Sequence, residues 1–179
     1  MFVVEMIASY FGDSVSLQAD ALDFFGDGVN YAISLFVLGM ALHLRARASL
    51  FKGLTMGVFG LWVLVSAGYR AFAGSEPEPT MMGSIALLAL IANVCVALTL
   101  YRYREGDSNM RSIWLCSRND AIGNIAVIIA AVGVFTSASR WPDLIVAILI
   151  ASLSLSAACH IIRLAIMEIR SGATTNIDT

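Results

Sequence analysis

The chain has 179 residues, of which 59% are apolar and only 13% are charged, and its formal net charge at pH 7 is -2. This composition is typical of an integral membrane protein and excludes an ordinary soluble domain. Because the sequence has no run of basic residues, we expect no binding to nucleic acid.

The first apolar segment, MFVVEMIASYF, is only about half as long as the roughly 20 residues that a membrane span needs. It lacks a basic start and contains Glu5, so a cleaved signal peptide is not expected. Five longer apolar stretches follow, at Leu22–Leu42, Gly53–Gly74, Met81–Tyr101, Ser112–Phe135 and Leu144–Ile166. We therefore predict an all-α membrane helix bundle of six transmembrane helices with a short first helix. Residues 1–170 are expected to form a single transmembrane domain, followed by a polar tail over 171–179.

Basic residues gather in two of the predicted connections and after the last span, namely at Arg45, Arg47, Lys52, Arg102, Arg104, Arg111 and Arg170. The other connections are poor in Lys and Arg. Because basic residues stay on the cytoplasmic side of a membrane, this bias predicts a cytoplasmic C-terminus. The short connections predict that neighbouring helices pack antiparallel.

Three aspartates, in QADALDFFGDGVNYA, lie at the start of the second predicted helix: Asp20, Asp23 and Asp27. Their spacing of i, i+3 and i+7 places all three carboxylates on one face of a helix. Ionisable groups at membrane depth are costly and by default mark an ion path or a paired site. Three acids without a basic neighbour repel one another, which favours a bound cation over a purely structural polar network. We expect Asp20 to be a neighbour of the site, and Asn30 to line the path or bond to another helix.

The fifth predicted span offers a second pair of ligands. Cys116 and Asp120 in WLCSRNDAIGN lie at i and i+4, so the thiol and the carboxylate share one helix face. This is the arrangement in which one helix offers two ligands to a transition metal. Asn119 and Asn124 flank the same face. The other two cysteines lie in apolar stretches and read as small buried side chains without a disulfide framework.

Three segments carry a resemblance to a known family. SVSLQADALDFFGDGVNYAISLFVLG resembles the second transmembrane helix of the cation diffusion facilitators, which typically reads S-L-L-A-D-A-L-H/D-S-L-S-D. WLCSRNDAIGNIAVIIAAVGV is similar to their fifth helix, typically Y-L-H-V-L-G-D-A-L-G-S-x-G-V, and WPDLIVAILIASLSL is similar to the start of their sixth. The resemblance covers nearly the whole chain, with its helices in the same order. Carried over position by position, it implies metal ligands at Asp23, Asp27, Cys116 and Asp120.

The resemblance implies a transporter, not an enzyme. Such a protein exports a divalent metal cation from the cytoplasm in exchange for protons; zinc is the first candidate, then cadmium or cobalt. It implies no prosthetic group, and its partners are the metal ion, protons, the lipid bilayer and a second copy of the chain in a homodimer. A compact bundle of this kind is expected in the bacterial inner membrane.

The sequence departs from the family pattern in ways that matter for the metal. Cys116 stands where the family usually has His, and a softer sulfur ligand favours zinc or cadmium over manganese or magnesium. The family's cytoplasmic metal-binding domain does not follow the sixth span, so we expect a short form whose dimer uses membrane helices alone. No His-rich loop joins the fourth and fifth spans.

Two other function classes remain open from the sequence. A non-transporting scaffold or regulatory subunit could bind metal and move none. A magnesium-dependent membrane lipid-headgroup transferase would begin its signature D-x-x-D-G-x-x-A-R at Asp20 and Asp23. Here Phe24 replaces the glycine and no Ala-Arg follows, so this enzyme class is the weaker alternative.

Overall fold

The computed structural model describes residues 1–36, 42–101 and 108–175, with the side chains at 30, 34–35, 42–43, 45, 100, 108–119 and 171–175 left aside. In chain order the six helices are α1 (Phe2–Phe11), α2 (Val15–Phe36), α3 (Leu42–Ala73), α4 (Pro79–Leu100), α5 (Ser108–Ser137) and α6 (Trp141–Thr175). These ranges contain no strand. The prediction of an all-α bundle of six helices with a short first one is therefore confirmed.

Four helical segments of the described ranges are long and apolar enough to cross a membrane: Ala46–Ala73, Pro79–Thr99, Asp120–Ser137 and Trp141–Arg170. The first helix, α1, has only 10 residues. The second helix, α2, has 22 residues, and its three aspartates lower its hydropathy. The protein is thus an integral membrane protein by the length and composition of its helices.

The helices extend beyond the predicted apolar stretches. The second helix begins at Val15, before the stretch that starts at Leu22, and the third begins at Leu42, before the stretch that starts at Gly53. The third begins early because polar residues continue a helix beyond the apolar stretch that hydropathy detects. For the same reason α6 continues to Thr175, so the first residues of the predicted polar tail are helical.

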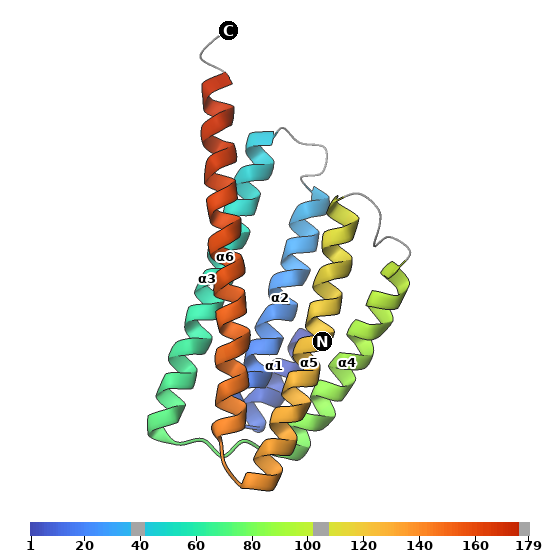
Figure 1. Cartoon of the computed structure of the whole chain (residues 1–179), viewed down its shortest axis with the longest axis vertical. Helices are drawn as coiled ribbons and strands as arrows, with labels where there is room; N and C mark the ends of the chain where they lie inside the picture. Colours follow the sequence, from blue (N-terminus) through green and yellow to red (C-terminus); the bar gives the residue numbers. More distant parts are fainter. Residues whose placement is uncertain (37–41, 102–107, 176–179) are drawn as a thin grey trace.

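The helices run side by side, with α2 lying between the α3–α6 pair and the α4–α5 pair (Figure 1). Glycines allow α3 to approach α6 closely. A β-carbon at Gly53 would lie 2.7 Å from Cγ1 of Ile162, and one at Gly60 would lie 2.9 Å from Cγ of Leu155. Small residues at a helix interface allow this close approach. The glycines of the segment KGLTMGVFG, residues 52–60, therefore form a face that packs α3 against α6 within one chain.

The N-terminus of α2 is bound by a carboxylate from α6. Asp143, in the first turn of α6, is fully buried. It accepts hydrogen bonds from the hydroxyls of Ser14 (2.7 Å) and Ser16 (2.6 Å) and from the amides of Val15 (2.9 Å) and Ser16 (3.1 Å). Amides at a helix N-terminus have no partner within the helix, and a carboxylate satisfies them and suits the helix dipole. This anchor explains why α2 begins well before its apolar stretch.

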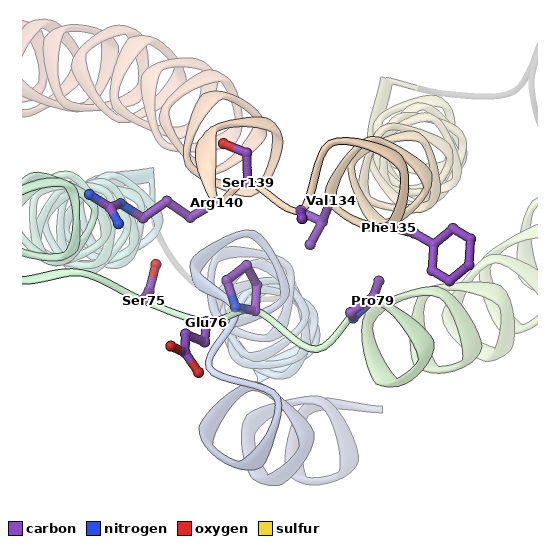
Figure 2. A pocket seen from close by; sticks show the side chains of 9 residues that line it. Ser75, Glu76, Pro79, Val134, Phe135, Ser139 and Arg140 are labelled. Carbon is purple, nitrogen blue, oxygen red and sulfur yellow. The ribbon is translucent and has the colours of Figure 1, made fainter.

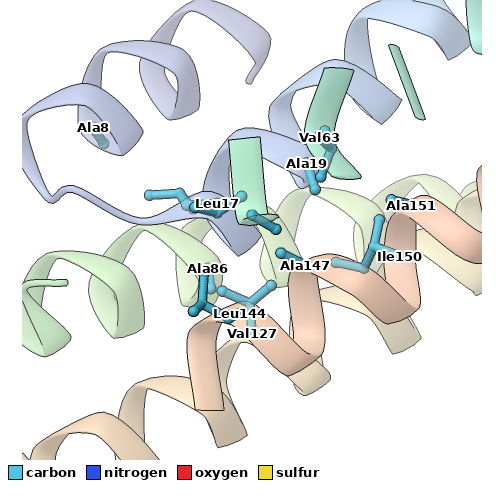
Figure 3. Packing of buried hydrophobic residues seen from close by; sticks show 12 residues of the cluster. Ala8, Leu17, Ala19, Val63, Ala86, Val127, Leu144, Ala147, Ile150 and Ala151 are labelled. Carbon is cyan, nitrogen blue, oxygen red and sulfur yellow. The ribbon is translucent and has the colours of Figure 1, made fainter. Parts of the chain in front are cut away.

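The buried apolar core is made mostly of small side chains. Figure 3 shows its members meeting between helices, among them Leu17 of α2, Val127 of α5 and Leu144 of α6. The α2 residues of this cluster precede Asp23 and Asp27 along the helix, so the apolar core lies on one side of the acidic residues. Many large apolar side chains elsewhere are exposed on the outside of the bundle, as expected for a surface that faces lipid.

Candidate metal centre

The three aspartates of α2 line the interior of the bundle. Asp20 is only 4% exposed, and Asp23 and Asp27 are half-buried. Asp23 and Asp27 are one helical turn apart, so their side chains lie on one face of α2 and their charges interact. Oδ2 of Asp20 has no hydrogen-bond partner within the described part of the chain.

A carboxyl group from α5 meets this face. Asp120 shares a hydrogen bond with Asp27 and also lies within electrostatic reach of Asp23. Acids from two separate helices therefore meet in the middle of the bundle, at a place that suits a proton or a cation.

Neighbouring polar groups fix parts of this arrangement. Oδ1 of Asp23 accepts a hydrogen bond from the hydroxyl of Ser154 on α6, at 2.9 Å. Asn124 is fully buried and donates from Nδ2 to the backbone carbonyl of Asp120, at 2.9 Å. This bond stays within α5, so Asn124 supports the helix beside Asp120. Its Oδ1 has no partner among the described residues.

Three predicted site residues fall on side chains outside the description: Cys116, Asn119 and Asn30. Their backbones belong to α5 and α2, and Cys116 precedes Asp120 by one turn of α5. Among the side chains that the structure describes, no group of three or more His, Cys, Asp or Glu is arranged to hold a metal ion. The four-ligand set of Asp23, Asp27, Cys116 and Asp120 therefore stays a prediction.

Three buried polar residues were not predicted from the sequence: Glu5 and Ser154 beside these acids, and Asp143 at the start of α2. Glu5 of α1 is fully buried, neither of its carboxyl oxygens has a partner in the described residues, and it interacts electrostatically with Asp20 and Asp120. A lone charge in an apolar segment is a signal that could have drawn attention to Glu5. Ser154 and Asp143 gave no comparable signal, because each makes its contact with a residue more than 100 positions away.

A surface pocket of about 400 Å³ lies elsewhere, at the end of the bundle where α5 turns into α6. Figure 2 shows that Ser75 and Glu76 of the connection before α4 line it together with Val134 and Arg140. None of the predicted metal ligands contributes to its lining. We therefore assign it no part in metal binding.

Comparison with known proteins gives matches over nearly the whole chain. The transmembrane domain of cation efflux proteins matches residues 1–169. The cadmium, cobalt and zinc/H(+)-K(+) antiporter of Bacillus velezensis is 22% identical over 190 residues, which cover 98% of this chain and 61% of that protein. The zinc transporter ZitB is 25% identical over 193 residues in Yersinia pestis, covering 98% and 61%, and 24% identical over 189 residues in Escherichia coli, covering 98% and 60%.

The chain thus spans about 60% of the length of these relatives. The match extends over all the helices that bear the acidic residues, including α2 and α5. The long apolar helices and the acids they carry into the interior of the bundle agree with it. The chain therefore belongs to the cation efflux family of membrane transporters, and what it matches is the family's transmembrane domain.

Proposed function

We propose that this chain carries a divalent metal cation, zinc in the first place and cadmium or cobalt after it, out of the cytoplasm in exchange for protons. The observation that carries the proposal is the contact between Asp27 of α2 and Asp120 of α5. The names of the relatives, which refer to zinc, cadmium, cobalt and H(+), support the choice of cargo and counter-ion.

The chemistry of the proposed ligands explains the exchange. Zinc takes four ligands from sulfur, nitrogen and oxygen donors, and the pairs Asp23–Asp27 and Cys116–Asp120 offer four side chains from two helices. Carboxylates and thiolates bind metal only after they lose their protons. Protons on these side chains therefore compete directly with the metal ion. Metal entering from one side displaces protons, and protons entering from the other side displace metal.

Transport further requires that the site open to one side of the membrane at a time. The position of α2 supports this, because α2 contacts both α5, which carries the second ligand pair, and α6. A small change in the angle between α2 and its neighbours would alter access to the acids without unfolding any helix. We propose that the protein works as a homodimer in the bacterial inner membrane, with its C-terminus in the cytoplasm. The distribution of Lys and Arg supports this orientation.

The experiment is zinc flux into vesicles that contain the full chain, with a pH gradient applied and a zinc-sensitive dye inside. Asp27→Asn and Asp120→Asn are expected to reduce flux to the level of empty vesicles. Glu76→Gln is the matched control, because Glu76 is an exposed acid in the connection before α4, and we expect it to leave flux unchanged. Unchanged flux in both aspartate variants would refute the proposal. Zinc binding without any flux by the unaltered protein would instead favour the scaffold alternative.

A further inference from the structure

Ser154 of α6 forms a hydrogen bond with one of the proposed metal ligands. Its hydroxyl donates to Oδ1 of Asp23 at 2.9 Å, and Ser154 itself is only 7% exposed. Oδ2 of Asp23 accepts no hydrogen bond among the described residues. The two oxygens of one carboxylate are therefore in different environments: α6 binds one, and the other is available to a cation.

A second contact between α2 and α6, made by Asp143, also fixes the position of α6 beside Asp23. Asp143 binds the N-terminus of α2, two turns before Asp23, and lies three turns before Ser154 on α6. Between Asp143 and Ser154, the same side of α6 carries the buried Ala147 and Ile150, which belong to the same apolar cluster as Leu17 and Ala19 of α2. Since α2 and α6 run in the same direction, these two contacts set both the spacing and the register of the helix pair (Figure 1).

The number of oxygens that a carboxylate offers affects which metal ion it prefers. Zinc takes about four ligands in a tetrahedron, and one oxygen from each carboxylate is enough. Larger hard cations such as manganese and calcium take about six or more oxygen ligands, often with both oxygens of one carboxylate. A hydroxyl that holds one oxygen of Asp23 therefore makes binding through both oxygens less favourable.

We propose that Ser154 is a positioning residue that makes Asp23 a one-oxygen ligand and so favours four-coordinate ions such as zinc over larger cations. This inference rests on the proposed function, because it needs Asp23 to bind the transported metal. It adds a specificity determinant on α6, a helix that contributes none of the four proposed ligands.

The test measures zinc and manganese binding to the purified full chain, together with the visible absorption of bound cobalt, which weakens when coordination rises above four. In Ser154→Ala we expect zinc affinity to fall about tenfold, as for other groups that orient a metal ligand. Manganese affinity should stay the same or rise, and the cobalt bands should weaken. Ser152→Ala is the matched control, because Ser152 is exposed on the same helix and its hydroxyl bonds to the carbonyl of Ile148 at 2.7 Å.

Ser154→Thr and Ser154→Val form a second pair that differs by the hydroxyl at nearly constant volume. The Thr variant should keep the zinc preference and the Val variant should lose it, even if the Ala variant does not yield stable protein. Equal zinc-to-manganese ratios in the Ser154 and Ser152 variants would overturn the inference, as would an equal loss of both metals with unchanged cobalt bands. These results leave the proposed function intact. If the unaltered protein binds no metal, the proposed function itself fails.

Discussion

Replacing Asp143 tests whether the anchor between α6 and α2 stabilises the protein. Asp143→Ala removes the acceptor of four hydrogen bonds. Two hydroxyl groups and two backbone amides then lose this hydrogen-bond partner. A hydrogen bond to a charged group contributes about 1.5–3 kcal/mol, but such contributions do not add for bonds to one carboxylate. Because water at the end of the bundle can replace part of them, we expect a loss of about 3 kcal/mol in the free energy of unfolding.

Two further variants make this value interpretable. Asp143→Asn keeps one oxygen acceptor and should lose about 1–2 kcal/mol, since mainly the bond from the Val15 amide to Oδ2 is affected. Glu78→Ala is the exposed counterpart. Glu78 caps α4 through the amides of Thr80 and Met81, at 3.0 and 2.6 Å, and its removal should cost about 1 kcal/mol.

The assay combines unfolding in detergent with amide hydrogen exchange over the first turn of α2. Asp143→Ala should speed exchange there and leave the first turn of α4 unchanged, whereas Glu78→Ala should have the opposite pattern. If Asp143→Ala loses no more stability than Glu78→Ala, then the buried carboxylate does not anchor α2 and our account of its start is incorrect.

Three further predictions concern other parts of the bundle. Cys116→Ser should abolish the sulfur-to-cobalt charge-transfer absorption of the cobalt-bound protein, and it should weaken cadmium binding more than zinc binding. An unchanged absorption spectrum would show that the thiol is not a ligand. Gly60→Leu should lower the yield of folded protein, because a β-carbon there would lie 2.9 Å from Cγ of Leu155. Gly68→Leu should be tolerated, because no atom lies within 4 Å of a β-carbon at that position. Equal yields of the two variants would contradict the close packing of α3 on α6. Glu5→Gln replaces a buried carboxyl group that has no hydrogen-bond partner among the described residues. Unfolding measurements should find the variant at least as stable as the unaltered chain, and a loss above about 1 kcal/mol would contradict this.

The sequence predicted the features that are repeated along a helix. Apolar stretches identified the long spans, and the spacing of Asp23 and Asp27 placed their carboxyl groups on one face, as the structure has them. Contacts between helices could not be predicted in this way. The approach of Asp120 to Asp27 was expected only from resemblance to a family, because no local pattern in either segment encodes which helix lies beside which.

The interhelical hydrogen bonds were missed for the same reason. Ser154 is one of several serines in an apolar helix, and its bond to Asp23 joins residues 131 positions apart. The start of α2 could not be placed from hydropathy, because Asp143, 128 positions from Val15, stabilises residues that hydropathy alone would assign to a connection. Such contacts depend on the packing of the whole bundle, and a window of sequence does not contain them.

The close packing of α3 on α6 affects how a movement at the proposed metal site would reach other helices. Leu155 presses against the backbone of α3 at Gly60, and its neighbour Ser154 holds Asp23 of α2. One turn of α6 therefore touches two other helices on two sides. If Asp23 binds the proposed metal ion, a displacement of Asp23 on its release would move Ser154 and the adjacent Leu155, and so would reach α3 at Gly60.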